Sequence, residues 1–156
     1  MARIKHDAGI AAWPHILPTE VIEELPFLAR WGAAVVSHGS RTRTLVVELD
    51  GRVAGFAVTR PSGDDDASAE TGELDAFYTE PPAWGLGAGR ALLAAATEAL
   101  RDDGFAEATL WTAELNHRPR RIYESAGWRP DGAERRRSFR GVELMELRYR
   151  LALGAP

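Results

Sequence analysis

The sequence contains no cysteine among its 156 residues. This absence excludes a disulfide framework, a thiolate zinc site and a cysteine nucleophile, and it fits a reducing cytosol. The chain also lacks an apolar run near the roughly 20 residues that a membrane span needs, and a charged leader followed by an apolar segment. We therefore expect a cytoplasmic protein with no membrane partner.

Basic residues are not in excess. The 19 Lys and Arg against 23 Asp and Glu give a formal net charge of −4, so general attraction to nucleic acid is not expected. The four histidines, at positions 6, 15, 38 and 117, have no paired metal spacing, and we expect no metal site. A chain of this length, 45% hydrophobic, suits a single domain over residues 1–156.

Helix and strand signals alternate along the chain. Asp50-Gly51, between apolar runs at 44–49 and 53–58, predicts an antiparallel hairpin. Further strands are expected at 73–79 and 108–112, and one or two at 138–151. Helices are expected at 7–13 and 19–31, from the glycine run at 84–89 until Gly104 stops it, and at 119–126, with at most a short strand at 2–4. The pattern predicts an α/β (α+β) fold: a mixed, mostly antiparallel twisted sheet flanked by helices, with a shortened N-terminal strand and helix.

The polar segment 61–72 is too poor in apolar residues to order itself, and we expect a mobile loop. Its acidic residues could alternatively form a lip that attracts cationic amines. These residues are Asp64, Asp65, Asp66 and Glu70.

Glycines at 85, 87 and 89 precede the longest predicted helix. They allow a tight turn whose amides, at the positive end of the helix dipole, can hold a phosphate or pyrophosphate. Glycines here can also serve merely to pack a helix closely on a strand, and the loop alone leaves both readings open. A dinucleotide fingerprint would need glycine at Arg90, and a Walker loop needs a lysine that this loop lacks, so neither is supported.

Two motifs together resemble the acyl-CoA-binding core of the GNAT family. They are the segment 73–93, and Asn116 followed by Arg-Ile-Tyr-Glu-Ser-Ala-Gly-Trp at 121–128. In that family Gln or Arg, two residues, Gly, one residue, then Gly or Ala bind the CoA pyrophosphate. Gly87 and Gly89 stand at the glycine positions, while Trp84 replaces the Gln or Arg and Leu86 takes a place where a basic residue is common. The pyrophosphate would then depend more on backbone amides, with Arg90 or Arg118 as compensating cations.

The resemblance implies an acetyl-CoA-dependent N-acetyltransferase that acts on a primary amine by direct attack in a ternary complex. Acetyl-CoA is its cosubstrate, and the backbone of Phe77 and Thr79 would pair with the pantetheine arm like an added strand. Asn116 would contact pantetheine at the end of its strand. The implied cofactor-binding residues are Phe77, Tyr78, Thr79, Trp84, Gly85, Leu86, Gly87, Ala88, Gly89, Arg90, Asn116 and Arg118.

Two side chains are the catalytic candidates that the resemblance implies. Tyr123 stands where the family directs a phenol at the CoA sulfur, and a phenol can protonate a leaving thiolate. Glu73, eleven residues before Trp84, matches the general base of the histone acetyltransferase branch. Asp75 or a water molecule is an alternative general base. Tyr123 could instead be only a core aromatic residue, and Glu73 only a solvated carboxylate.

The acceptor, a small-molecule or peptide amine, is not identified by the sequence. In the family the opening helices build the acceptor pocket, so Trp13 and Trp31 could touch substrate. The compressed N-terminal region leaves open a homodimer, or residues upstream of the given start. The arginines at 118, 120 and 121 and at 135–137 could reach CoA phosphates, although such runs are usually solvated. The alternative function is a non-catalytic acyl-CoA-binding sensor or interaction module.

Overall fold

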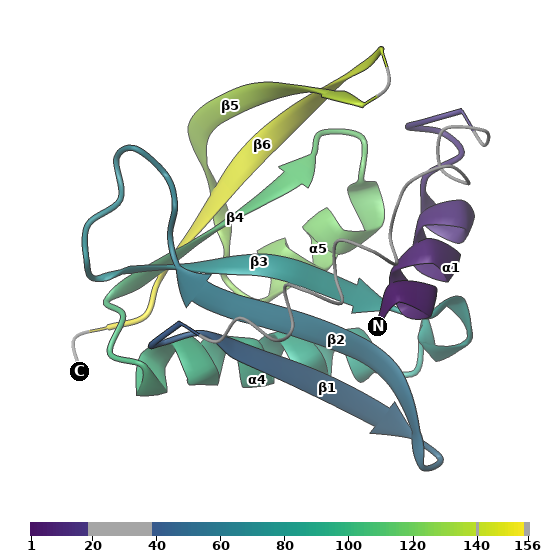
Figure 1. The fold of residues 1–156 in the computed structure, drawn as a ribbon, viewed down its shortest axis with the longest axis horizontal. Helices are drawn as coiled ribbons and strands as arrows, with labels where there is room; N and C mark the ends of the chain where they lie inside the picture. The colour runs from purple at the N-terminus through teal and green to yellow at the C-terminus, as the bar shows by residue number, and fades with distance from the viewer. Residues whose placement is uncertain (19–38, 140, 155–156) are drawn as a thin grey trace.

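The computed structural model describes residues 1–18, 39–139 and 141–154. Within these residues six strands form one sheet with helices on both faces (Figure 1). The elements are α1 (Ala2–Ala12), β1 (Arg43–Leu49), β2 (Arg52–Pro61), β3 (Thr71–Thr79), the 3₁₀ turn η1 (Pro81–Ala83), α4 (Ala88–Asp102), β4 (Glu107–Ala113), α5 (His117–Ser125), β5 (Arg129–Phe139) and β6 (Val142–Ala152). The strand order is β1-β2-β3-β4-β6-β5, and only the β3–β4 pair is parallel. The predicted mixed, mostly antiparallel sheet is confirmed.

The predicted hairpin is confirmed, and its turn residues Asp50 and Gly51 have φ values of 51° and 72°, as a tight two-residue turn requires. The expected scrap of strand at 2–4 is wrong, because α1 begins at Ala2 and Asp7 lies inside the helix. The last hairpin starts earlier than the expected residue 138, since β5 begins at Arg129. The helix predicted at 19–31 lies outside the described residues.

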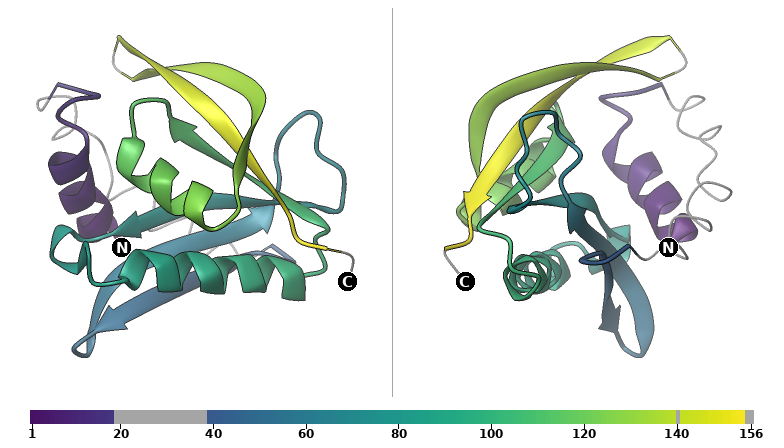
Figure 2. Two further views of the ribbon diagram at one scale, coloured as in Figure 1. Left: turned by 180° about the vertical axis from the view of Figure 1, so that it is seen from behind. Right: turned by 60° about the vertical axis from the view of Figure 1, so that its left-hand side comes forward.

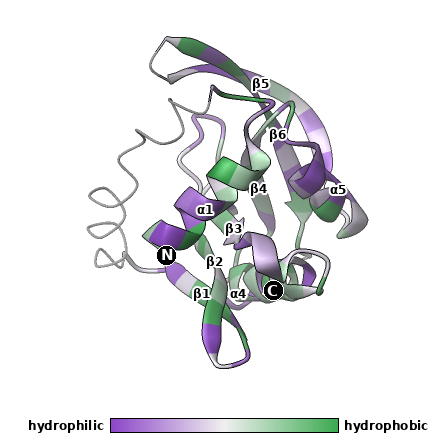
Figure 3. Cartoon of the chain, turned by 90° about the vertical axis from the view of Figure 1, so that its right-hand side faces the viewer, coloured by the Kyte–Doolittle hydropathy of each residue, from purple (hydrophilic) through white to green (hydrophobic). Residues whose placement is uncertain are grey.

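The helices divide between the two faces of the sheet. Helices α4 and α5 lie on one face and α1 on the other (Figure 2). The larger core lies under α4 and α5, where Leu92 and Leu100 pack with Trp128 and Tyr149. Under α1, Ile4 packs on Phe56 and its neighbours in β2 and β3. Along α1 the hydrophilic residues lie mostly in its first turns and the hydrophobic ones toward its end (Figure 3), and its buried residues are Ile4, Ala8 and Gly9.

The parallel pair β3–β4 holds the sheet together over a short distance. Its register covers Thr71 with Glu107, Gly72 with Ala108, and Glu73 with Thr109, and beyond these pairs the two strands separate. Glycine is required at position 72, in the short parallel segment of β3, because a Cβ there would lie 2.6 Å from Leu100 Cδ2 on α4. A bulge follows, since Val58 pairs with Ala76 and Thr59 with Leu74, which leaves Asp75 without a partner in β2.

Among the described residues, no helix is long and apolar enough to span a membrane.

Candidate active site

A cavity of about 1070 Å³ opens where β3 and β4 separate. Its walls come from α1 and the residues just after it, from β2 and β3, from β4 and α5, and from the β5–β6 hairpin. Of the predicted site residues, those that line it are Glu73, Phe77, Tyr78, Thr79, Trp84, Asn116, Arg118 and Tyr123, and Trp13 lines it as well. Segments far apart in the sequence therefore share one cavity.

Tyr123 projects from α5 and is 94% buried, with its ring 5.7 Å from that of Phe77 and 6.1 Å from that of Tyr149. Its hydroxyl has no hydrogen-bond partner among the described residues, whereas the Tyr149 hydroxyl donates to Glu124 at 2.7 Å. Burial raises the pKa of Tyr123 above its ordinary value, so the phenol stays protonated at neutral pH. The structure thus places an uncommitted hydroxyl donor at the cavity wall.

Glu73 and Asp75 form an acidic pair on β3 that meets one arginine of β2. Arg60 Nη2 lies 2.9 Å from Glu73 Oε2 and 2.9 Å from Asp75 Oδ1. Glu73 is 7% exposed, and desolvation by its surroundings raises the pKa of this carboxyl, against the opposing effect of the Arg60 charge. A carboxyl with a raised pKa that lines a cavity is a suitable candidate for proton exchange with a ligand.

The glycine loop has the backbone that a phosphate site needs. Gly85 and Gly87 have φ values of 83° and 87°, and Gly87 is the N-cap of α4. Within the described residues, the amides of 85 and of 87–90 have no acceptor in the protein. This loop lies outside the cavity walls, on the chain just after Trp84, with Gly85, Leu86, Gly87 and Arg90 exposed.

Trp84 ties this loop to the cavity. Its indole Nε1 donates to the Thr79 carbonyl at 3.0 Å, and its ring lies 4.3 Å under the Arg118 guanidinium. The tryptophan at the position of the family's polar residue therefore holds a cation beside the loop. Because β3 no longer pairs with β4 at Phe77, the side of β3 that faces the cavity is free to pair with an extended ligand.

The opposite wall and the side chains behind it include Trp111 and Arg148, which the sequence analysis did not single out. Trp111 of β4 lines the cavity and donates from Nε1 to Asp64 Oδ1 at 2.8 Å. Arg148 of β6 is 7% exposed and pairs with Asp64, Asp66 and Asp131 at 3.2, 2.6 and 2.7 Å. The expected acidic lip is thus partly neutralised, and segment 62–70 is fixed to the sheet by these contacts. Only a known sheet order could have revealed such long-range pairs.

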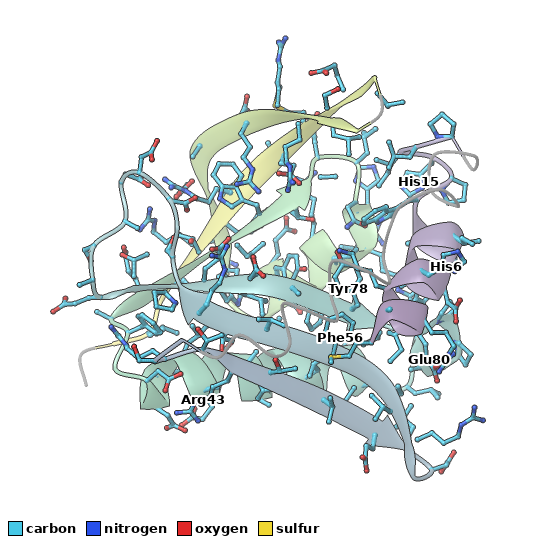
Figure 4. The ribbon with its side chains drawn as sticks, in the orientation of Figure 1. His6, His15, Arg43, Phe56, Tyr78 and Glu80 are labelled. Atoms are coloured by element: carbon cyan, nitrogen blue, oxygen red, sulfur yellow. The ribbon has the colours of Figure 1, made fainter. Side chains whose placement is uncertain are left out.

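The last hairpin and the segment after α1 complete the walls. Arg135 and Arg137 line the cavity, and Arg135 Nε lies 2.6 Å from Glu146 Oε2. His15, labelled in Figure 4, hydrogen-bonds through Nε2 to the Leu115 carbonyl at 2.9 Å. This bond joins the region of α1 to the loop before α5. No group of three metal-ligating side chains occurs among the residues that the structure describes.

Comparisons with known proteins agree with this geometry. The model of the acetyltransferase (GNAT) family matches residues 6–128. Mycothiol acetyltransferase of Thermomonospora curvata is 36% identical over 83 residues, which are 53% of this chain and 26% of the relative, so the chain spans about a quarter of that relative's length.

Two solved structures show the same fold. The PaiA N-acetyltransferase of Thermoplasma acidophilum, in complex with coenzyme A, has a TM-score of 0.75 and 15% identity, over 97% of this chain and 89% of that one. The ribosomal-protein-S18-alanine N-acetyltransferase of Escherichia coli has a TM-score of 0.71 and 20% identity, over 99% and 86%. With the family match, they lead to one conclusion: the chain belongs to the GNAT acetyltransferase family.

Proposed function

We propose that the protein transfers an acetyl group from acetyl-CoA to a primary amine by direct attack in a ternary complex. The observation that carries this proposal is that Glu73 and Tyr123 line one cavity, beside the unpaired edge of β3. A proton acceptor and a hydroxyl donor are the two groups that aminolysis of a thioester needs.

The cosubstrate would occupy two parts of the protein. The free amides of 85 and of 87–90 would hold the pyrophosphate, with Arg118 and Arg90 as cations, and the β3 backbone at Phe77 and Thr79 would hold pantetheine. The Thr79 carbonyl already accepts from Trp84, so the thioester would bind other backbone groups of β3, on the side that faces away from β2. Asn116, whose Nδ2 lies 3.5 Å from Thr112 Oγ1, would contact pantetheine from the end of β4.

The chemistry would proceed with the amine bound near Glu73. An alkylammonium has a pKa near ~10.4 and must lose a proton to attack, and the Glu73 carboxylate accepts that proton. The nitrogen attacks the thioester carbon, the C–N bond forms, the C–S bond breaks, and the electron pair leaves with sulfur. The Tyr123 hydroxyl hydrogen-bonds to that sulfur. Because its pKa is raised, donation of a hydrogen bond precedes any complete transfer of its proton.

The acceptor is tested with an amine panel. It contains alkylamines, polyamines, aminoglycosides and peptides that begin with alanine, the last suggested by the E. coli relative. We expect release of free CoA thiol that depends on one class of amine, and heat of acetyl-CoA binding by calorimetry without any amine. Binding without turnover on any amine would favour the non-catalytic module. No binding at millimolar acetyl-CoA would contradict the proposal as a whole.

A further inference from the structure

Arg60 occupies a distinctive place in the cavity. A single nitrogen, Nη2, lies 2.9 Å from one carboxylate oxygen of Glu73 and 2.9 Å from one of Asp75. Arg60 and Glu73 are direct cross-strand partners, and the bulge at Asp75 brings the second carboxylate to the same nitrogen. The seat between the two carboxylates is therefore the size of one nitrogen and carries two negative charges.

The contact leaves hydrogen-bonding atoms of Glu73 and Arg60 without partners. Arg60 Nη2 makes a hydrogen bond with good geometry to Asp75, but Glu73 Oε2 and Arg60 Nε are buried and have no hydrogen-bond partner. Bidentate pairing is the strong arrangement for arginine and a carboxylate, and it is not used here. A compact nitrogen with three N–H donors, such as an alkylammonium, can serve both carboxylates from the same seat.

The three side chains also differ in their freedom to move. The Glu73 side chain is 9% exposed, whereas the side chains of Asp75 and Arg60 are 34% and 40% exposed. The carboxylate of Glu73 is fixed in the wall, while the guanidinium lies at the border of solvent. The end of the Arg60 guanidinium can therefore move toward water when another cation takes its place between the two acids.

We propose, resting on the proposed function, that Arg60 is a positioning residue whose guanidinium holds the seat between Glu73 and Asp75 that the acceptor's ammonium takes on binding. The exchange conserves charge, because one cation replaces another between two carboxylates. Once Arg60 has left, the ammonium gives one proton to Glu73 and becomes the neutral amine that attacks the thioester. The substrate class is a primary alkylamine, charged at neutral pH, rather than an aromatic amine, which is uncharged.

The charged groups that face Glu73 set its pH response. They are Arg60 from β2, Asp75 from β3, and Asp64 from segment 62–70, whose neighbour Gly63 presents its backbone amide. Removal of the Arg60 charge leaves only acidic neighbours, so the pKa of Glu73 rises further. The acidic limb of the kcat/KM profile should then move to higher pH in Arg60→Gln.

The test measures binding of butylammonium to the protein without acetyl-CoA, by the NMR shifts of ¹³C-labelled side-chain carboxylates. If Arg60 leaves the seat free in about a tenth of molecules, Arg60→Gln should bind butylammonium about tenfold more tightly. Arg60→Lys keeps a competing cation and should bind as the wild type does. Arg43→Gln is the matched control, because Arg43 also pairs with a carboxylate, Asp103 at 2.6 Å, but does not line the cavity.

The outcomes separate this inference from the proposed function. Tighter binding in Arg60→Gln alone, with a lower KM for an alkylamine, supports the inference. Binding that weakens or does not change in Arg60→Gln, or that is absent in all variants, overturns it. If butylammonium binds as expected but no amine is acetylated, the seat stands and the proposed function fails. If amines are acetylated and Arg60→Gln leaves both binding and KM unchanged, the inference alone fails.

Discussion

The two ends of the candidate site are built from different parts of the chain. The loop at 85–90 offers the backbone amides of 85 and of 87–90, and its geometry depends on glycines with positive φ. The amine end is built from side chains of β2, β3, β4, β5 and β6, which meet through pairs such as Arg60 with Glu73. The loop end consists of backbone groups from neighbouring residues, whereas the amine end consists largely of charged side chains that are far apart in the sequence.

The difference explains how the loop tolerates unusual residues. Trp84 and Leu86 replace polar residues of the family pattern, yet Gly87 still begins α4 in the left-handed region, and a backbone site depends little on side-chain identity. At the amine end, each charge is positioned by another charge. A single substitution there should therefore affect several neighbours, and the following variants test this contrast.

The largest effect is expected from Arg148→Met beside the amine end, because Arg148 and Asp64 both contact Trp111 of the cavity wall. This change removes the cation that pairs with Asp64, whose side chain is 12% exposed, and leaves Asp131 paired with Arg150 alone at 3.1 Å. The free energy of unfolding should fall by about 3 kcal/mol, as for one broken partner of a buried ion pair. Urea denaturation measures this loss, and steady-state kinetics should show a higher KM for the amine with unchanged acetyl-CoA affinity.

The control for Arg148 is an ion pair on the surface. Glu98→Gln removes the exposed contact of Glu98 with Arg101 on α4, and the free energy of unfolding should fall by less than about 1 kcal/mol. Equal losses in the two variants, or equally weakened acetyl-CoA binding and amine binding in Arg148→Met, would contradict the separation of the two ends.

Tyr123→Phe should show the next largest effect. The change removes the hydroxyl but keeps the ring that packs against Phe77 and Tyr149. Turnover should fall about 100-fold, since a donor to the leaving sulfur is lost, while acetyl-CoA binding stays nearly unchanged. Tyr149→Phe is the control, because its hydroxyl bonds to Glu124 and Arg120 instead. Turnover that is unchanged in Tyr123→Phe would remove this residue as the proposed acid.

The smallest effect is expected at the backbone end. Gly87→Ala forces an L side chain into the left-handed region at φ 87°, where strain of about 1–2 kcal/mol should weaken acetyl-CoA binding roughly tenfold. Gly104→Ala places the same strain, at φ 74°, after the other end of α4, and neither new Cβ meets an atom within 4 Å. Calorimetry should therefore find weaker binding in Gly87→Ala alone. Equal acetyl-CoA binding in the two variants would contradict a pyrophosphate site made of the backbone amides of this loop.

The sequence was sufficient for the parts of the fold with local signals. The hairpin turn at Asp50 and Gly51, the helix after the glycine loop, and the mixed sheet could all be predicted from periodicity and turn chemistry. The motif at 116–128 also marked Tyr123, which lines the cavity. Its catalytic role, like that of Glu73, remains a prediction.

The features that sequence analysis missed depend on distant partners. The strand β5 contains Arg135, Arg136 and Arg137 and no hydrophobic alternation, so only its pairing with β6 identifies it. Arg148 lies 84 residues from Asp64 in the sequence. The contact of Arg60 with Asp75 depends on a bulge in β3 that no local sequence pattern predicts. The start of α1 was missed because Asp7 suggested an N-cap, whereas the helix starts five residues earlier without a side-chain cap.

The missing side chain at Gly72 has a consequence for how α4 is anchored. A Cβ at residue 72 would collide with Leu100 near the C-terminal end of α4 and with Phe105 just after it, at the end of the helix far from the glycine loop. Helix α4 is about 22 Å long at 1.5 Å per residue, so the contact that needs glycine at 72 and the loop with glycines at 85 and 87 act on opposite ends of one helix.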